Sequence, residues 1–208
     1  MPDLLLLAAS GLAREVARST LPGWCVVGVL DDDPEVHGTK LAGLPVLGGI
    51  DDAAGRSEHL VVCVGAGAGR RRIVERLEAL GVTEDRFGTV LADAVRIPEG
   101  CTVGAGSILL KGAVLTADVS VGRHSVLMPN VTLTHDDILE DFVTIATGVA
   151  LGGGVRVGEA AYLGMNVSVR QTVRIGAGAT IGMGAAVLGD VPDGETWAGV
   201  PARRLAQR

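Results

Sequence analysis

Aromatic side chains are scarce in this chain of 208 residues: they make up 2% of it, although 48% of the residues are hydrophobic. Aromatic rings supply much of the buried area in most cores, so the core of this protein must be built from smaller side chains. The chain also has 31 glycines. This composition excludes a bulky, irregular core and favours a narrow interior of regular shape.

Basic charge is in short supply as well, since the formal net charge is −6. Nucleic acids attract basic surfaces, so we expect no nucleic-acid partner. Cysteines are too few and too dispersed for a disulfide framework or a cysteine-rich zinc site, with Cys25, Cys63 and Cys101 spread along the chain. Such sparse cysteine use indicates a reducing, cytoplasmic setting.

Long hydrophobic runs are missing too. The first eleven residues, MPDLLLLAASG, lack the basic region of a signal peptide, and their apolar run is far too short to span a membrane. We interpret this run as a buried first strand and expect no membrane partner.

Residues 1–92 alternate short apolar runs with helical segments. The expected strands are residues 4–7, 25–30, 60–64 and a short one near 89–91, and the expected helices are residues 12–20 and 70–80. In the second helix Ile73, Val74, Leu77 and Leu80 share one face, and Gly81 is placed to end it. This alternation predicts a small parallel sheet of Rossmann-like type.

Residues 93–190 follow a different rule, a period of six. Stepping by six from Ile97 to Val187 meets sixteen residues, all of them Ile, Leu or Val. These types fill roughly a third of the segment, so chance would give such a run with odds on the order of 10⁻⁸, and a fixed period is the signature of a repeat fold. The sixteen residues are Ile97, Val103, Leu109, Leu115, Val121, Leu127, Leu133, Leu139, Ile145, Leu151, Val157, Leu163, Val169, Ile175, Ile181 and Val187.

A unit of six residues makes one flat strand and one corner, so three units make one triangular coil. Each aliphatic residue is expected to point inward and to stack on its equivalent eighteen residues away, with a small residue or Val two positions before it. Glycine often follows the aliphatic residue, and we expect it to supply the unusual dihedral angles of the corners. Because each coil contacts only its neighbours, both ends need a cover. The first domain, residues 1–92, covers one end, and residues 191–208 form a tail that covers or flanks the other.

The hexapeptide array resembles the left-handed parallel β-helix of the acyltransferase superfamily that uses acetyl-CoA. The whole chain resembles one subfamily, the bacterial amino-sugar-nucleotide N-acetyltransferases with the sialic acid O-acetyltransferase-like proteins. The resemblance implies a Rossmann-like sugar-nucleotide domain before the β-helix, a left-handed coil, and a homotrimer. Its landmarks are residues 9–11 with 14–16, 29–33, 43–48, 64–65 with 71–81, 134–136 and 199–203.

His135 is the leading catalytic candidate. Acyl transfer from a thioester needs a base for the proton of the attacking amine or hydroxyl, and histidine titrates in the required range. The alternative is a solvated corner histidine, but the family motif in register favours the base. Asp136 follows it, as an acidic residue does in the family, and the implied role is to raise the basicity of His135.

Two other polar residues of this domain, Asp137 and His124, also need an interpretation. Asp137 falls on an inward corner position, where a buried charge is costly. It either bonds the corner backbone, distorts the corner or assists His135. His124 lies eleven residues before His135, so it is not the equivalent residue of an adjacent coil, and we expect it on a surface corner. A zinc site of three histidines is excluded because this domain has only two.

The resemblance places acetyl-CoA in a groove between two subunits. The matching positions are Thr144, Gly153, Met165 and Met183. Family members often carry histidine in place of Thr144 and glycine in place of Met183, so a polar contact and the groove width are altered. The two methionines could equally be ordinary solenoid surface. Arg203 and Arg204 either meet the CoA phosphates or form a solvated tail.

In the first domain the family binds a nucleotide sugar at the strand ends, the usual place in an open α/β sheet. The matching residues are Ser10, Gly11, Leu12, Asp31, Asp32 and Gly65. The first loop would approach the phosphates at a helix N-terminus, and the aspartates would bond the base or ribose unless residues 31–33 are only a turn. Residues 65–69 lack the full spacing of a dinucleotide loop, so a nicotinamide cofactor is discounted.

Two further departures bear on the acceptor. Leu12 stands where the family usually has a histidine that contacts the nucleotide sugar, and Met128 stands where asparagine is common. The resemblance therefore implies an acetyl-CoA-dependent N-acetyltransferase acting on an amino sugar, most naturally a nucleotide-linked one, and needing no metal. The alternatives are an O-acyltransferase acting on a sugar or sialic acid hydroxyl, and a non-catalytic trimeric binding protein.

Overall fold

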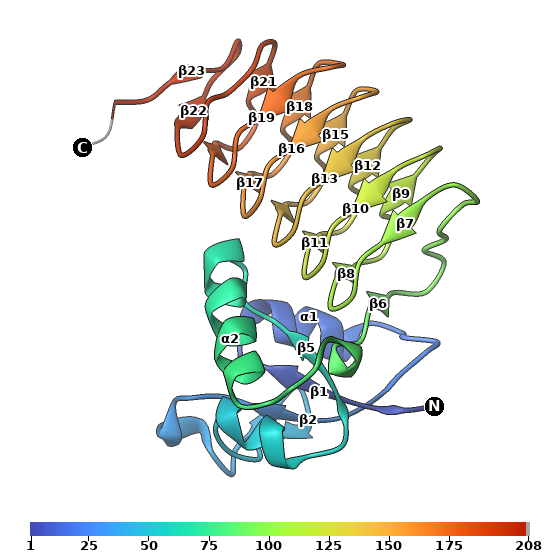
Figure 1. Cartoon of the computed structure of the whole chain (residues 1–208), viewed down its shortest axis with the longest axis vertical. Helices are drawn as coiled ribbons and strands as arrows, with labels where there is room; N and C mark the ends of the chain where they lie inside the picture. The colour runs from blue at the N-terminus through green and yellow to red at the C-terminus, as the bar shows by residue number, and fades with distance from the viewer. Residues whose placement is uncertain (207–208) are drawn as a thin grey trace.

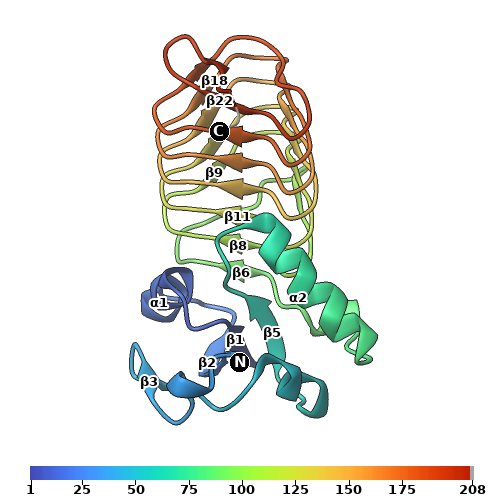
Figure 2. The ribbon, with the colours of Figure 1, turned by 90° about the vertical axis from the view of Figure 1, so that its left-hand side faces the viewer.

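A computed structural model of the protein, which describes residues 1–206, consists of a small α/β part and a triangular coil stacked on it (Figure 1). After a quarter turn the N-terminal part lies beneath the stacked turns of the coil, with α2 alongside the junction (Figure 2). No helix among the described residues is long and apolar enough to cross a membrane.

The N-terminal part is built on a three-stranded parallel sheet in the order β2-β1-β5. Its strands are β1 (Asp3–Leu7), β2 (Cys25–Leu30) and β5 (His59–Val62), and its α-helices are α1 (Gly11–Arg18) and α2 (Gly67–Ala79). Its shorter elements are η1 (Pro34–Val36), β3 (Lys40–Leu41), β4 (Leu44–Pro45), η2 (Ile50–Gly55) and η3 (Glu84–Arg86). The predicted parallel sheet with alternating helices is confirmed.

Local signals explain where the two helices begin and end. The Ser10 hydroxyl accepts a hydrogen bond from the Ala13 amide at 3.1 Å and so caps α1. Gly81 follows α2 with a φ of 89°, the left-handed conformation that ends many helices, as expected. Helix α2 begins three residues earlier than predicted, at Gly67. Packing against the coil overrides the weak helix propensity of the glycines there.

The short strand expected near residues 89–91 exists, but it is the first strand of the coil. As β6 (Val90–Leu91) it pairs in parallel with β8 (Ile108–Leu109), eighteen residues further on. The three-stranded sheet does not include it. The six-residue frame therefore begins just before Ile97, where the aliphatic stepping was first recognised.

Three sheets form the faces of the coil. Sheet I contains β6, β8, β11 (Val126–Leu127), β14 (Thr144–Ile145), β17 (Tyr162–Leu163), β20 (Thr180–Ile181), β22 (Thr196–Ala198) and β23 (Arg203–Arg204). Sheet II contains β7 (Thr102–Val103), β10 (Ser120–Val121), β13 (Ile138–Leu139), β16 (Arg156–Val157) and β19 (Arg174–Ile175). Sheet III contains β9 (Val114–Leu115), β12 (Thr132–Leu133), β15 (Ala150–Leu151), β18 (Ser168–Val169) and β21 (Ala186–Val187).

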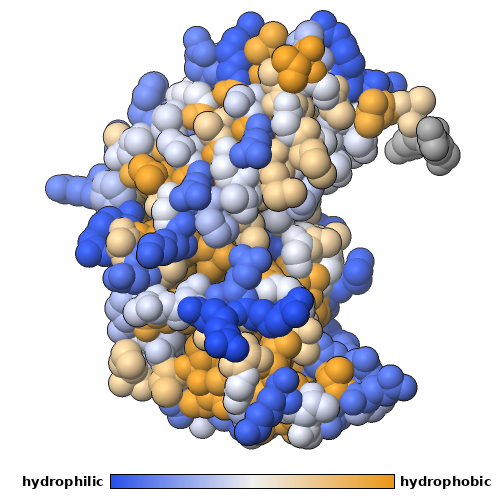
Figure 3. All heavy atoms as spheres, turned by 180° about the vertical axis from the view of Figure 1, so that it is seen from behind, coloured by the Kyte–Doolittle hydropathy of each residue, from blue (hydrophilic) through white to orange (hydrophobic). Residues whose placement is uncertain are grey.

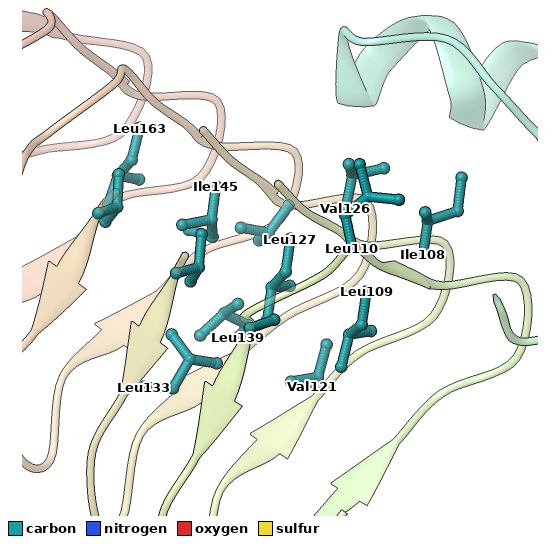
Figure 4. Packing of buried hydrophobic residues seen from close by; sticks show 14 of the residues in the cluster. Ile108, Leu109, Leu110, Val121, Val126, Leu127, Leu133, Leu139, Ile145 and Leu163 are labelled. Carbon is teal, nitrogen blue, oxygen red and sulfur yellow. The ribbon is translucent and has the colours of Figure 1, made fainter. Parts of the chain in front are cut away.

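The aliphatic residues of the six-residue repeat fill the interior of the coil. Of the sixteen, all but Ile97 and Val103 are buried, which leaves fourteen. Figure 4 shows several of them stacked one above another between the strands. Ile97 is 39% exposed because it precedes the first complete turn, so it has no coil beneath it. Stacking at intervals of eighteen is confirmed, for example by the pairing of Leu127 with Leu109 and Ile145.

The glycines that follow the aliphatic residues have a different role from the one expected. Their φ angles are not positive; instead a side chain there would strike the next coil, as at Gly122, where an added Cβ would lie 2.5 Å from the backbone carbon of Glu140. Positive φ occurs two residues later in each repeat, at every sixth residue from Gly106 to Gly184. The glycines that directly follow the aliphatic residues are therefore required for close stacking and not for unusual dihedral angles.

Both ends of the coil are covered. One apolar core joins the N-terminal sheet to the coil, since Leu4 and Leu6 belong to the same buried cluster as Ile108 and Leu109. At the other end β22 pairs with β20 and β23 folds back on it antiparallel, while residues 207–208 lie outside the described chain. Hydrophilic side chains are scattered over the face seen from behind rather than gathered in one block (Figure 3).

Candidate active site

His135 lies on an exposed corner of the coil between β12 and β13, where sheet III meets sheet II. Its side chain is 69% exposed, and its backbone is held by the next coil because the Gly154 amide donates to its carbonyl at 2.9 Å. Asp136 has a φ of 62°, which turns the chain at this corner and aims consecutive side chains outward. The residue predicted as the base is therefore accessible.

His135 and Asp136 form a hydrogen-bonded pair. The Nδ1 atom of His135 lies 2.7 Å from an Oδ2 atom of Asp136. This bond raises the pKa of His135 above its ordinary value, and the charge of Asp136 adds to the effect. Because Asp136 occupies Nδ1, it orients the ring so that Nε2 is the nitrogen presented to a substrate.

Gly153 lies against the His135 ring, on the next turn of the coil, eighteen residues further along the same corner. A Cβ atom at Gly153 would collide with the Cε1 and Nε2 atoms of the ring and would lie 2.9 Å from Nδ1. The absence of a side chain at Gly153 therefore allows the ring to lie against the next turn of the coil. The structure brings together three predicted site residues at this corner: His135, Asp136 and Gly153.

Asp137 is fully buried and braces this corner from inside. Its carboxylate accepts hydrogen bonds from the Thr134 amide and from the Val155 amide of the next coil, both at 2.8 Å. Burial raises the pKa of Asp137 to about 6, against these two hydrogen bonds, which lower it. Of the interpretations considered for Asp137, bonding of the corner backbone is confirmed.

A cavity of about 450 Å³ opens on another edge of the coil, between the N-terminal part and sheet I. Its lining residues are Ser10, Gly11, Leu12, Glu15, Gly65, Val126, Met128, Thr144, Ala146, Thr147, Tyr162 and Met165. The cavity brings together four of the six predicted acceptor residues with two of the predicted cofactor residues, Thr144 and Met165. Asp31, Asp32, Gly153 and Met183 do not line it.

The polar groups at the base of this cavity are already bonded within the protein. The Ser10 hydroxyl donates to the Cys63 carbonyl, and the Thr144 hydroxyl donates to the Gly65 carbonyl at 2.8 Å. Leu12 and Val126 are buried beside them. The cavity therefore presents an apolar floor, with Glu15 as its charged lining residue.

The two aspartates after β2 serve the local structure. Asp31 accepts hydrogen bonds from the Ala9 and Asp33 amides. Asp32 accepts from the Ile50 amide, and its other oxygen lies 2.8 Å from an Nη2 atom of Arg76. Their carboxylates fix the loops at the edge of the sheet, beside the first loop.

The cavity and the histidine corner lie at different edges of the same coil. Met128 and Met165 belong to the corner that precedes sheet III, whereas His135 belongs to the corner that follows it. The strand β12 and the width of sheet III separate them. One copy of the chain therefore does not bring His135 to its own cavity.

The remaining predicted cofactor positions lie toward the far end of the coil. Met183 is 71% exposed, one coil beyond Met165 on the same corner. Arg204 forms an ion pair with Glu195 at 3.1 Å, and Arg203 bonds the Ala202 carbonyl. Among residues 1–206 no group of three or more potential metal ligands comes together.

Two interior residues differ from the sequence analysis. His124 was expected on a surface corner, which is wrong: it is 1% exposed, covered by Phe87 and stacked on Phe142 with ring centroids 5.2 Å apart. Burial lowers its pKa to about 4. Arg70 was not singled out, yet it is buried at the junction of the two parts. The available signal was its position on the helical face of Val74 and Leu77.

A triangular coil built from six-residue repeats, with a histidine–aspartate corner and a cavity between it and a parallel-sheet domain, defines the class of hexapeptide-repeat acyltransferases. Comparison with known proteins agrees. Residues 3–77 match the PglD N-terminal domain family. A comparison with curated protein sequences found no match.

Solved structures resemble the whole chain. The acetyltransferase domain of PglB from Neisseria gonorrhoeae FA1090, in complex with acetyl coenzyme A, is 30% identical with a TM-score of 0.89, over 98% of this chain and 99% of that one. WeeI from Acinetobacter baumannii AYE is 27% identical with a TM-score of 0.81, over 98% and 99%. PerB from Caulobacter crescentus, in complex with CoA and GDP-perosamine, is 25% identical with a TM-score of 0.88, over 99% and 98%. The chain belongs to the family of hexapeptide-repeat, left-handed β-helix sugar N-acetyltransferases.

Proposed function

We propose that the protein transfers the acetyl group of acetyl-CoA to the amine of a nucleotide-linked amino sugar, with His135 as general base. The observation that carries the proposal is the His135–Asp136 pair, bonded at 2.7 Å and lying over Gly153 on an accessible corner. The relatives support the two substrates, because PglB is in complex with acetyl coenzyme A and PerB with CoA and GDP-perosamine.

In the reaction the neutral amine nitrogen attacks the thioester carbonyl carbon, so a C–N bond forms and the C–S bond breaks. The Nε2 atom of His135 takes the amine proton and then gives it to the departing CoA thiolate, so that CoA leaves as the thiol and His135 ends the cycle neutral. Asp136 holds the ring by Nδ1 and stabilises the imidazolium that forms. Asp137 does not touch the substrates but keeps the corner in place through its two backbone bonds.

The site is completed by a second copy of the chain. His135 and the interdomain cavity lie on different edges of one coil, so an acceptor in the cavity meets the His135 of a neighbouring copy. A homotrimer with one site at each of its interfaces satisfies this geometry by cyclic symmetry. In this arrangement the donor lies along Gly153 of one copy and Met165 and Met183 of the next.

The division of labour follows from the same arrangement. Residues 1–92 hold the acceptor with Ser10, Gly11, Leu12 and Gly65, and Asp31 and Asp32 shape the nucleotide end. Residues 93–190 hold the donor and supply the base, and residues 191–208 cover the coil. A cytoplasmic location suits a CoA thioester donor and three unpaired cysteines.

Thiol release from acetyl-CoA tests this proposal. Wild-type protein is assayed against UDP- and TDP-linked amino sugars, free amino sugars and sialic acids, with mass spectrometry to place the new acetyl group on nitrogen or oxygen. We expect turnover with a nucleotide-linked amino sugar, and loss of about 10²-fold or more in kcat on His135→Ala. O-acetylation of a sugar or sialic acid would replace the proposal with an O-acyltransferase.

The assembly is tested separately by the mass in solution. We expect three copies, and mixed trimers that combine His135→Ala chains with chains blocked at the cavity should regain part of the activity at shared interfaces. A monomeric protein with full turnover would refute the site between copies. Binding of CoA with no turnover of any acceptor would instead indicate a non-catalytic binding protein.

A further inference from the structure

The N-terminal part and the coil meet around one buried arginine, Arg70, which is 1% exposed. It extends from α2 into the junction and contacts three separate segments of backbone. Its Nε atom donates to the His124 carbonyl at 2.7 Å, and Nη1 donates to the Val64 and Gly65 carbonyls at 2.8 and 3.0 Å. Its Nη2 atom donates to the Phe142 and Val143 carbonyls at 2.8 and 3.0 Å.

These five bonds use all five N–H groups of the guanidinium. No carboxylate of residues 1–206 pairs with this cation, so its charge is balanced by carbonyl dipoles alone. Burial lowers the pKa of Arg70 to about 10, and it remains charged at neutral pH. Lysine has three donors at one point and cannot reproduce this planar fork.

Arg70 binds carbonyls in or next to the segments that form the two walls of the interdomain cavity. Gly65 lines the cavity from the N-terminal side, and Val64 precedes it. On the coil side Val143 precedes the lining residue Thr144, whose hydroxyl also donates to the Gly65 carbonyl at 2.8 Å. The His124 carbonyl lies two residues before the lining residue Val126. Arg70 itself is outside the cavity.

Gly67 brings the first turn of α2 close enough for this contact. A Cβ atom at Gly67 would collide with the Phe142 carbonyl oxygen and would lie 3.0 Å from the Cα atom of Ala160. The helix start therefore rests directly on the coil backbone. Any side chain at Gly67 must push the two parts away from each other.

We propose that Arg70 is a positioning residue for the acceptor: it fixes the spacing between the two walls of the interdomain cavity and thereby the fit of the nucleotide-linked sugar. The inference rests on the proposed function. Neighbouring Arg71 provides a matched control, because it crosses the same junction in an exposed ion pair with Glu159 at 2.7 Å. Exposed ion pairs of this kind contribute little to the free energy of folding.

The first test compares Arg70→Lys with Arg71→Ala in steady-state kinetics. We expect Arg70→Lys to raise the acceptor KM about tenfold or more, because the loss falls on acceptor binding. The acetyl-CoA KM should change less, by about twofold at most, since of the proposed donor residues Gly153, Met165 and Met183 only Met165 lines the cavity. Arg71→Ala should match wild type in both constants. An unchanged acceptor KM in folded Arg70→Lys would overturn the proposal.

Gly67→Ala is the second variant, because it should widen the junction while leaving Arg70 itself unchanged. It should raise the acceptor KM in the same direction as Arg70→Lys, and it keeps the proposal testable if the arginine variant does not fold. Equal acceptor and donor effects in Gly67→Ala would also overturn it.

Hydrogen exchange on the substrate-free protein separates this inference from the proposed function. We expect residues 64–66 and 142–144 to lose protection together in Arg70→Lys and in Gly67→Ala, but not in Arg71→Ala. If wild type turns over no amino sugar, the proposed function fails whatever the exchange result. If wild type is active and both segments keep their protection in the variants, the role of Arg70 fails alone.

Discussion

Gly153→Ala tests the proposed catalytic corner without altering His135 or Asp136, the two residues to which we assign catalysis. Gly153 has no positive φ, so alanine suits the backbone, and the three atoms nearest to the new methyl group all belong to the His135 ring. The exposed ring must turn away from the next coil and from Asp136. Displacing a catalytic group by about 1 Å can cost about 10²-fold, so we expect kcat to fall by about 10- to 100-fold.

The same variant changes the titration of His135. The bond to Asp136 raises the pKa of His135, so a ring turned away from Asp136 should titrate closer to its ordinary value, at lower pH. NMR titration of the imidazole signals measures this shift, and calorimetry with CoA separates it from any loss of donor binding. The melting temperature should change little because no buried group moves.

Gly189→Ala is the matched control for this experiment. Gly189 occupies the same corner position two coils further on, has no positive φ, and an added Cβ there has nothing within 4 Å. It should match wild type in kcat and in the His135 titration. If Gly153→Ala kept wild-type kcat and an unchanged His135 titration, the contact between His135 and Gly153 would have no part in catalysis.

Three further predictions concern the same corner and the core. Asp136→Asn should lower the His135 pKa, so the acidic limb of the kcat/KM profile should move to lower pH while the plateau falls. Asp137→Ala leaves the Thr134 and Val155 amides unpaired and should cost about 2–5 kcal/mol in urea unfolding at neutral pH, offset in part by removal of a buried charge. The folded pKa of Asp137 lies near 6, above its ordinary value of 3.8, so its contribution to wild-type stability falls as pH rises from about 4 to 6 and the variant should lack this slope. Leu163→Ala should cost about 2–5 kcal/mol by opening a cavity in the stack, measured by the same unfolding experiment.

The coil could be predicted in detail because its interior repeats. Because each inward residue stacks on equivalent residues in the turns before and after it, every sixth position requires an aliphatic residue. The spacing of these aliphatic residues therefore located nearly every strand. The agreement weakened at the start of the coil, where Ile97 and Val103 are not buried. The role of the glycines that follow the aliphatic residues was predicted wrongly because two different causes favour glycine at a corner. One is close stacking and the other is a positive φ, and the sequence alone does not distinguish them.

The candidate site was predictable residue by residue but not in its arrangement. The family motif located His135 and Asp136, whereas the period of six does not say which face of the coil the first domain covers. That contact decides the environment of Thr144, which lies with the acceptor residues, and of His124, which Phe87 covers. Arg70 stands within three consecutive arginines, a pattern typical of a solvated helix face, and its place on the face of Val74 and Leu77 does not by itself predict its bonds to coil carbonyls.

Because the six-residue repeat of the coil is uninterrupted, the length of the coil can change only in fixed steps. Beyond His135 the same corner position recurs at Gly153, Gln171 and Gly189 on successive turns. Neighbouring turns are about 4.8 Å apart, the spacing of neighbouring strands. Removing eighteen residues beyond Gly153 would delete one of these positions and leave every later side chain on the same face of the coil as before. Removing any number that is not a multiple of six would turn the aliphatic residues outward. The number of corner positions beyond the histidine can therefore change only by whole turns if every later side chain is to keep its face, while His135 and Asp136 stay in place.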